Sequence, residues 1–207
     1  DLRDGNVYQM VTIGNQIWMA ENLAYLPSVT GPSLGYNGTP YYYVYGYDGT
    51  DVNDAKATSN YDTYGVLYNW TAAMASSVSS EANPSGVQGV CPTGWHLPSD
   101  AEWTELTDYL GGISGAGGKL KETGTTHWNS PNEGATNETG FTALPAGFRN
   151  HQHEAFHSLW SSGFWWTASE FDEEFAWYRL IRNSTSEITR GMNTKETGYS
   201  VRCVKDN

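Results

Sequence analysis

Residues 91–110, CPTGWHLPSDAEWTELTDYL, carry the signals that decide the fold. Ser99 and Glu102 form the S-x-x-E pattern of a capping box, in which each side chain accepts a hydrogen bond from a backbone N–H that the first helical turn leaves unpaired. Apolar side chains then recur at helical spacing on one face: Trp103, Leu106 and Leu110. Two glycines follow at 111–112, where a helix would end. The stretch therefore predicts an amphipathic helix that packs against a core and has no chemistry of its own.

Other periodic segments lie on both sides of this helix. Residues 64–76, YGVLYNWTAAMAS, place apolar residues four apart and predict a second helix. Residues 4–24 predict a hairpin with its turn at Gly14 and Asn15. Five short strand candidates follow residue 140: 141–148, 163–169, 175–181, 187–190 and 199–204. Two main helices followed by short, mostly antiparallel strands predict an α+β fold, and we expect one domain over residues 1–207.

The remaining segments have the composition of loops. Residues 25–63 are rich in Gly, Tyr and Asp, and we expect a long loop or insertion there. Within it, 41–47 has the strand propensity of a short ribbon. Polar loops are also expected at 77–90 and 119–140, the latter anchored by Trp128, and a Gly-rich turn at 111–118.

Composition and charge exclude two classes of function. The formal net charge is -12, and no cluster of Lys and Arg is longer than a pair, so we expect no nucleic-acid partner. No apolar run approaches the ~20 residues of a bilayer-spanning helix. Aromatic residues make up 14% of the chain and charged residues only 16%, which leaves a polar surface with Tyr and Trp available for contacts.

Two cysteines, Cys91 and Cys203, are the only ones in the chain. An even count in a Lys-poor, aromatic chain favours an oxidising compartment. A bridge would pin the last strand to the start of the central helix, and we favour it over two separate buried thiols. Because the chain starts at Asp1 without Met, we expect a mature product whose targeting segment has been removed.

Five motifs, in this order, resemble the Fibrobacter succinogenes major paralogous domain family: 16–23 QIWMAENL, 64–70 YGVLYNW, 91–103 CPTGWHLPSDAEW, 163–169 GFWWTAS and 198–204 GYSVRCV. That family resembles the C-type-lectin-like fold, in the branch that includes formylglycine-generating enzyme. The resemblance implies secreted or surface-attached proteins, often lipoproteins, whose molecular function is largely unassigned.

The resemblance also bears on the cysteines. In C-type-lectin-like domains a cysteine near the first helix pairs with one in the last strand, and Cys91 and Cys203 occupy equivalent places. Formylglycine-generating enzyme instead uses two late cysteines to bind copper. This chain has only Cys203 there, so we expect no enzyme of that kind, and fold kinship alone does not transfer activity.

Two segments have ligand atoms for a metal. Asp48, Asp51, Asn53 and Asp54 alternate oxygen ligands on a Gly-containing loop and could hold calcium. The register is not that of an EF-hand, and an Asx-rich turn is the favoured alternative. The histidines of 151–157 could form a metal site with Glu154, although exposed polar residues are the commoner outcome. We expect no required cofactor, with calcium as the one candidate.

The region 150–187 mixes aromatic, polar and charged residues where C-type-lectin-like domains present their ligand face. We expect Trp165, Trp166 and Trp177 to be core. The candidate ligand-binding residues are Asn150, His151, His153, His157, Trp160, Phe171, Asp172, Glu173, Arg182 and Asn183. Aromatic and Arg anchors among small polar neighbours are typical of recognition surfaces, and a solvated rim around buried aromatics is the alternative.

The expected function is an extracellular or cell-surface binding or adhesion module that recognises a glycan or a protein through this late region. One alternative is a structural subunit of a surface filament, with self-association through the Tyr-rich segment 36–47. Another is a diversity-generating variable ligand-binding protein, because several such proteins use this fold and vary the late region. An enzyme would need a pocket of perturbed titratable groups, and no convincing set appears in the sequence.

Overall fold

The computed structural model describes residues 1–206, which combine 17% helix with 27% strand. The helices are α1 Val52–Lys56, α2 Ser59–Tyr64, α3 Trp70–Met74, α4 Asp100–Tyr109 and α5 Ile113–Leu120. The strands are β1 Met10–Ile13, β2 Gln16–Met19, β3 Tyr42–Tyr43, β4 Leu67–Tyr68, β5 Trp95–His96, β6 Ala146–Asn150, β7 Ala155–Leu159, β8 Ser162–Glu170, β9 Phe175–Arg182, β10 Ile188–Thr194 and β11 Val204–Lys205. The fold is α+β, as predicted.

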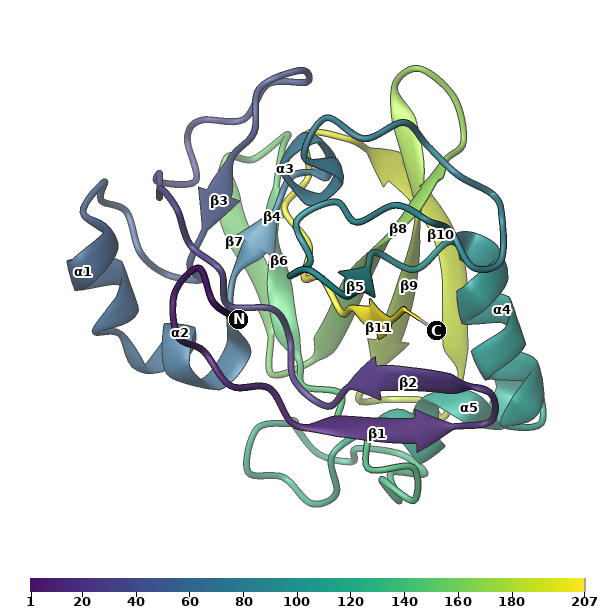
Figure 1. The fold of residues 1–207 in the computed structure, drawn as a ribbon. Helices are drawn as coiled ribbons and strands as arrows, with labels where there is room; N and C mark the ends of the chain where they lie inside the picture. Colours follow the sequence, from purple (N-terminus) through teal and green to yellow (C-terminus); the bar gives the residue numbers. More distant parts are fainter. Residues whose placement is uncertain (207) are drawn as a thin grey trace.

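Three sheets organise these elements (Figure 1). The largest has the order β10-β9-β8-β6-β7 and is antiparallel except where β6 meets β8 in parallel. A second sheet, β1-β2-β11-β5, joins the N-terminal hairpin to the C-terminal strand, and β3 pairs with β4. Helices α4 and α5 lie along the β9–β10 side of the large sheet, so the sheet edge and the two helices enclose part of the core (Figure 1).

The central prediction is confirmed. Helix α4 has the full capping box: the Ser99 hydroxyl accepts from the Glu102 N–H, and the Glu102 carboxylate accepts from the Ser99 N–H. Its apolar face is buried as the spacing predicted, with Trp103 and Leu106 inaccessible to solvent. The hairpin is also confirmed, because β1 and β2 pair with Ile13 opposite Gln16 and leave Gly14 and Asn15 as the turn.

Three predictions from local pattern are wrong or incomplete. The helix expected at 64–76 forms only at α3, because Tyr68 pairs with Tyr199 through two backbone hydrogen bonds and Asn69 then caps the helix. The Gly-rich turn expected at 111–118 is helix α5, where Gly117 packs against the backbone of Glu187 so closely that a Cβ could not fit. The long loop at 25–63 contains α1 and α2, and strand β7 was not predicted at all.

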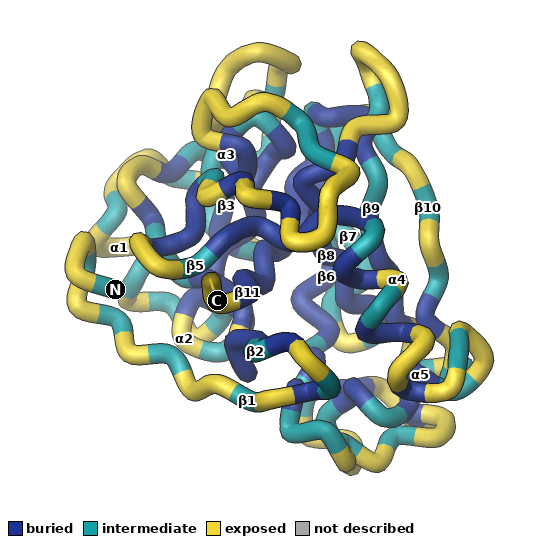
Figure 2. The backbone as a smooth tube through the Cα atoms, turned by 45° about the vertical axis from the view of Figure 1, so that its right-hand side comes forward, coloured by how far each residue is buried: buried dark blue, intermediate teal, exposed yellow. Residues whose placement is uncertain are grey.

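The backbone is buried at the centre of the molecule and exposed in the outer loops (Figure 2), and the interior holds two main hydrophobic clusters. One gathers around α4 and α5 and includes Trp18, Trp103, Phe141 and Trp165. The other contains Trp166, Tyr199 and both cysteines, together with residues of β2, α3 and the adjoining loops. Trp128 is 1% exposed and donates its indole N–H to the Ala143 carbonyl, so it anchors the 119–140 loop as predicted.

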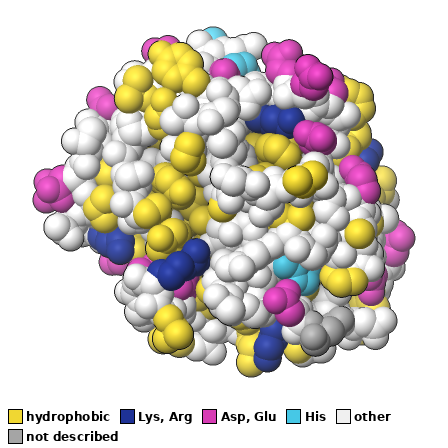
Figure 3. Space-filling model, turned by 45° about the horizontal axis from the view of Figure 1, so that its top comes forward, with side chains coloured by type: hydrophobic (Ala, Val, Ile, Leu, Met, Phe, Trp, Pro, Cys, Tyr) yellow, Lys and Arg dark blue, Asp and Glu magenta, His cyan; other side chains and the backbone are white. Residues whose placement is uncertain are grey.

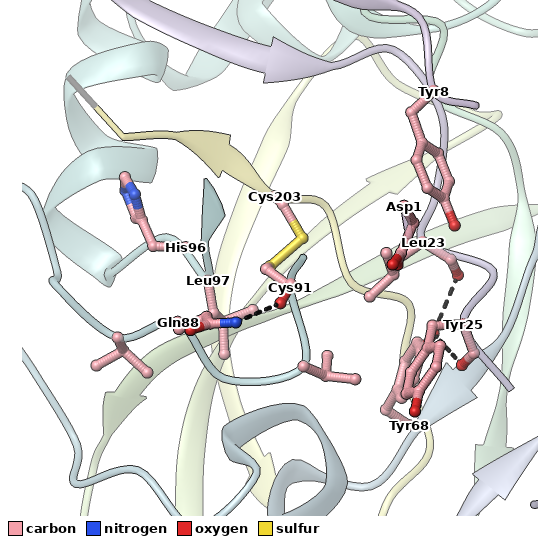
Figure 4. Close-up of a disulfide and its surroundings, with 12 residues drawn as sticks. Asp1, Tyr8, Leu23, Tyr25, Tyr68, Gln88, Cys91, His96, Leu97 and Cys203 are labelled. Carbon is pink, nitrogen blue, oxygen red and sulfur yellow. Dashed lines mark hydrogen bonds between the residues drawn. A yellow bond between two sulfur atoms is a disulfide. The ribbon is translucent and has the colours of Figure 1, made fainter. Parts of the chain in front are cut away.

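The predicted disulfide is present. Cys91 and Cys203 are bonded across 112 residues of sequence and are fully buried (Figure 4). Gln88 donates to the Cys91 carbonyl, and the Tyr68 hydroxyl lies within hydrogen-bond distance of the Leu23 and Tyr25 carbonyls nearby. The bridge therefore joins the segment before α4 to the C-terminal strand, which is where the sequence placed it.

The interior also contains buried Lys and Arg side chains, which the sequence did not predict. Five of the eleven Lys and Arg side chains are buried: Lys121, Arg149, Arg179, Lys195 and Arg202. Three of them, Lys121, Arg149 and Lys195, donate mainly to backbone carbonyls, and Arg202 divides its hydrogen bonds between two carbonyls and the Asn22 side chain. Lys121, for example, donates to the carbonyls of Glu133, Arg182 and Thr185. Such a cation supplies the hydrogen bonds that a loop carbonyl cannot obtain from a helix or sheet.

A buried histidine ties the C-terminal strand to α4. His96 is 3% exposed, and its Nε2 and Nδ1 lie 2.7 Å from carboxylate oxygens of Glu102 and Asp206. Because a neutral imidazole has only one N–H, the doubly protonated form fits this geometry. Burial lowers the pKa of His96, but the hydrogen bonds and negative charges of Glu102 and Asp206 outweigh burial and raise its pKa above 6.5.

We expect this contact to make stability fall as the pH rises. The folded-state pKa of His96 exceeds the unfolded value, so its contribution is complete below about pH 6.5 and is lost as pH passes through the raised pKa. Urea unfolding from pH 5 to 9 (a range set by the ~6.5 reference pKa of His) measures the effect in the wild type and in His96→Gln. An equally steep decline in both proteins over this range would contradict the assignment to His96.

Candidate functional site

Nine of the ten candidate ligand-binding residues lie at two opposite ends of the large sheet, and the tenth, His157, lies in the middle of β7. Strands β6 and β8 run parallel where Gly147 lies opposite Gly163, so the turns that follow them lie at the same end. These turns, 150–154 and 171–174, meet the segments 34–41 and 195–197 at what we call the loop end, toward the top of Figure 1. Its predicted members are Asn150, His151, His153, Phe171, Asp172 and Glu173.

Arg149 holds the early segment against the late one. Its guanidinium is 1% exposed, donates to the carbonyls of Pro32 and Glu196, and lies over the ring of Tyr43. Gly35 approaches this guanidinium so closely that a Cβ would overlap it. The Glu196 carboxylate in turn accepts from the Asn37 N–H. Segments more than a hundred residues apart are therefore fixed side by side.

Lys195 holds the turn between β8 and β9. Its ammonium group donates to the Asp172 and Glu173 carbonyls at 2.8 and 3.0 Å and pairs with the Glu170 carboxylate at 2.9 Å. The same group lies 4.7 Å from the centre of the Trp70 ring. All three N–H groups of this ammonium donate hydrogen bonds, so the buried charge fixes the backbone of the turn around it.

The side chains that the loop end presents to solvent are aromatic, imidazole and acidic. Tyr36 is 61% exposed and Phe171 is 49% exposed, while His153, Asp172 and Glu173 are exposed as well. Figure 3 shows acidic and hydrophobic side chains side by side on the upper surface. Within residues 1–206, the side chains of Tyr36, His153 and Phe171 form no hydrogen bond, and each packs against one neighbouring ring while its outer part faces solvent. This surface has the chemistry of a recognition face over a fixed framework.

The histidines are used partly within the fold. His151 lies 3.2 Å from the Thr197 hydroxyl, and burial lowers its pKa. Asn150 accepts from two backbone N–H groups of its own turn. His157, on β7, packs its half-buried ring against Phe148. Within residues 1–206, no three His, Cys, Asp or Glu side chains are grouped as a metal site would need.

The opposite end holds Trp160, Arg182 and Asn183. Trp160 is 53% exposed and has φ of 64°, and its carbonyl accepts from the Asn129 N–H. Asn183 donates to the carbonyls of Asn129 and Ser130. The sequence treated all ten candidate residues as one face. The structure separates these three from the loop-end residues by the length of the strands.

The predicted calcium segment forms the start of α1. Asp51 is its N-cap and accepts from the N–H groups of Asn53 and Asp54. Asp48 lies against Gly31. This arrangement is the Asx-type turn that was the favoured alternative, and calcium at Asp48, Asp51, Asn53 and Asp54 stays a prediction.

One tryptophan was misassigned and one arginine was missed. Trp165 and Trp166 are fully buried, as predicted, but Trp177 is only partly buried and lies under the guanidinium of Arg190. Side chains of a strand alternate between its two faces, so a strand over 188–194 would have placed Arg190 and Met192 on the same face. Nothing in the sequence shows that this face stays open to solvent.

The comparisons with known proteins concern the family alone. The sequence model of the Fibrobacter succinogenes major domain matches residues 11–205. The chain therefore belongs to this family, as its five motifs predicted. Comparison with curated proteins and with solved structures finds no significant match in either set. Between Asp1 and Asp206, no helix has the length and hydropathy that crossing a membrane requires.

The role of Lys195 is tested by Lys195→Met, which keeps the volume of the side chain but removes its donors. We expect amide hydrogens of residues 170–175 to exchange at least tenfold faster, because hydrogen bonds to a charged donor contribute roughly 1.5–3 kcal/mol. Amides of α4, which Lys195 does not touch, are the internal control. Unchanged exchange at 170–175 would show that the turn holds its shape without the ammonium group.

Proposed function

We propose that this chain is an extracellular binding module whose ligand face is the loop end. The observation that supports this most directly is that the residues that hold the loop backbone differ from those that face solvent. Buried Arg149 and Lys195 hold the backbone, while Tyr36, His153 and Phe171 extend into solvent. Loops that are ordered before a ligand arrives lose less entropy on binding, so such a face is well suited to recognition.

The proposed ligand is a glycan or a protein. Aromatic rings offer flat contact area, and imidazole, phenol and carboxylate groups offer hydrogen bonds. The exposed carboxylates of Asp172 and Glu173 would repel a polyanion, and the nearby basic groups Arg149 and Lys195 are buried and already paired. A neutral glycan or a surface with basic residues therefore fits this face better than an acidic polymer.

The wider setting is also part of the proposal. A disulfide is typical of proteins outside the reducing cytoplasm, and it supports a secreted or surface-attached protein. We propose a C-type-lectin-like arrangement for this fold, on the strength of the bridge from the segment before α4 to the residue that precedes the last strand. Diversification of the late region would be compatible with a framework that does not depend on the exposed side chains.

A structural subunit is the second candidate, and one observation favours it. Leu2, Val7 and Met10 are 107%, 81% and 57% exposed, and β1 is the edge strand of its sheet. An unpaired strand edge beside apolar side chains is a template for pairing with another chain. Oligomers in solution that dissociate in Val7→Asp would support this role.

The proposed face is tested with arrays of immobilised neutral and acidic glycans and of extracellular proteins. The loop-end variant is Tyr36→Ala/His153→Ala/Phe171→Ala, and the matched control at the other end is Trp160→Ala/Arg182→Ala/Asn183→Ala. We expect the loop-end variant to lose at least tenfold in affinity for a ligand of the wild type, because aromatic anchors commonly contribute ~2 kcal/mol or more each. The control should bind within about threefold of the wild type.

Loss of binding in the control alone would place the site at the Trp160 end. Binding that survives in both variants would contradict a ligand face at either end of the large sheet. Thermal unfolding of each variant, compared with the wild type, separates loss of the site from loss of the fold.

A further inference from the structure

A second site lies on the flank of the molecule, where β9 and β10 pass the first turn of α4. Arg190 is fixed there by two contacts. Its Nε donates to both Asp100 carboxylate oxygens at 3.0 and 2.8 Å, and its guanidinium carbon lies 3.3 Å from the centre of the Trp177 ring. Because Asp100 holds one edge of the guanidinium and Trp177 covers one face, the orientation of its plane is fixed before any ligand binds.

The outer edge of this guanidinium is free. Its Nη1 and Nη2 make no hydrogen bond or ion pair with any residue from 1 to 206, and the side chain is 43% exposed. Two parallel N–H groups at that edge match the two oxygens of a carboxylate. By contrast, within residues 1–206 the side chain of Arg182, at the end of β9, makes one hydrogen bond, to the Thr189 hydroxyl at 3.5 Å, and no cation–π contact.

The charges around Arg190 suit a ligand with one carboxylate better than a polyanion. Asp100 is shared, because Arg179 also pairs with it at 2.9 Å, and Arg179 is 4% exposed with its Nε unpartnered. One carboxylate therefore faces two guanidiniums. Exposed Asp108 lies near enough to affect Arg179, and the turn with Asp172 and Glu173 is acidic. These carboxylates balance the two guanidiniums and would repel a polyanion, so a ligand with one carboxylate would be held by the free Nη1 and Nη2 edge of Arg190 and not by a surplus of positive charge.

An apolar strip adjoins the guanidinium. Phe171 stands edge-on to Trp177 with ring centroids 5.1 Å apart, and Met192 lies directly across the strand pair from Trp177. Phe171 and Met192 are each 49% exposed. A ligand held by its carboxylate at Arg190 could therefore cover apolar surface with the group next to that carboxylate.

We infer that Arg190, with Trp177, Met192 and Phe171, forms a binding site for a monocarboxylate that carries an apolar group. Arg190 binds the carboxylate through Nη1 and Nη2, Trp177 and Asp100 hold the guanidinium in plane, and Met192 and Phe171 contact the apolar group. The ligand chemistry has two sources, a free organic acid and the C-terminal carboxylate of a polypeptide that ends in an apolar residue. Phe171 also belongs to the loop end, but the site goes beyond the proposed function, because Arg190, Trp177 and Met192 lie outside the loop-end framework of Arg149 and Lys195 and the Arg190 variants leave Phe171 in place.

The test is a titration of the full chain with phenylacetate and with its neutral analogue phenylacetamide, followed by the methyl resonance of Met192. We expect a saturable shift with the acid and at least tenfold weaker binding of the amide, since charge-assisted bidentate hydrogen bonds are lost. Arg190→Gln and Arg190→Lys should each weaken binding of phenylacetate at least tenfold, the second because an ammonium group lacks the planar fork. The matched control Arg182→Gln should bind as the wild type does.

Acetyl-Ala-Phe with a free C-terminus separates the two sources. Affinity at least tenfold above that of phenylacetate would assign the site to a polypeptide end, and equal or weaker affinity would assign it to a free acid. Three results would overturn the inference: equal binding of acid and amide, phosphate binding more tightly than phenylacetate, or no saturable shift up to about 20 mM, well above the millimolar Kd expected of so small a ligand.

Discussion

The hydrogen bonds of the buried Arg202 guanidinium are the interaction on which the rest of the fold depends. This guanidinium is fully buried, donates to the Met19 and Phe141 carbonyls and to the Asn22 side chain, and lies over the Phe141 ring. Burial lowers the pKa of Arg202 to about 9, and none of these partners is a carboxylate. Asn22 also accepts from the Trp165 indole, so one buried polar centre joins the early hairpin, the large sheet and the last segment.

Other buried cations also donate hydrogen bonds to backbone carbonyls, in other parts of the fold. A chain with 17% helix and 27% strand leaves many backbone carbonyls without partners in regular structure. Lys121, Arg149 and Lys195 supply those partners for the loops around them. Because five of the eleven basic residues are buried, the outer surface is more acidic than the composition alone implies. The composition of the loop end therefore follows from how the loops are held.

Local signals in the sequence were sufficient for elements whose stability is local. The capping box at Ser99 and Glu102 and the turn at Gly14 and Asn15 act within a few residues, and both were predicted correctly. The segment 64–76 has helical periodicity, yet Tyr68 pairs with Tyr199, a partner 131 positions away that no local pattern reveals. Helix α5 was missed because Gly117 and Gly118, which are unfavourable in an isolated helix, are needed here for close packing on the backbone of Glu187 and Gly134.

The same limit applies to the candidate sites. The family motifs identified Cys91 and Cys203 correctly, since cysteine chemistry is specific. The late region was also identified as polar and aromatic, but its division into two ends depends on the parallel contact of β6 with β8. The surface around Arg190 needs Asp100, Trp177 and Met192 together, from three separate elements. Sequence spacing cannot show that such residues meet.

The most direct test of this account is the unfolding free energy of Arg202→Met. Replacing a buried ionic group by a well-packed apolar one is often neutral or stabilising when both partners are replaced. Here the partners are backbone carbonyls and Asn22, which remain buried after the substitution. The account predicts a loss of about 2–4 kcal/mol in urea unfolding at neutral pH, because each buried acceptor left without a donor costs roughly 1–3 kcal/mol. A variant as stable as the wild type would contradict it, because the loops would then hold their positions without the buried cation.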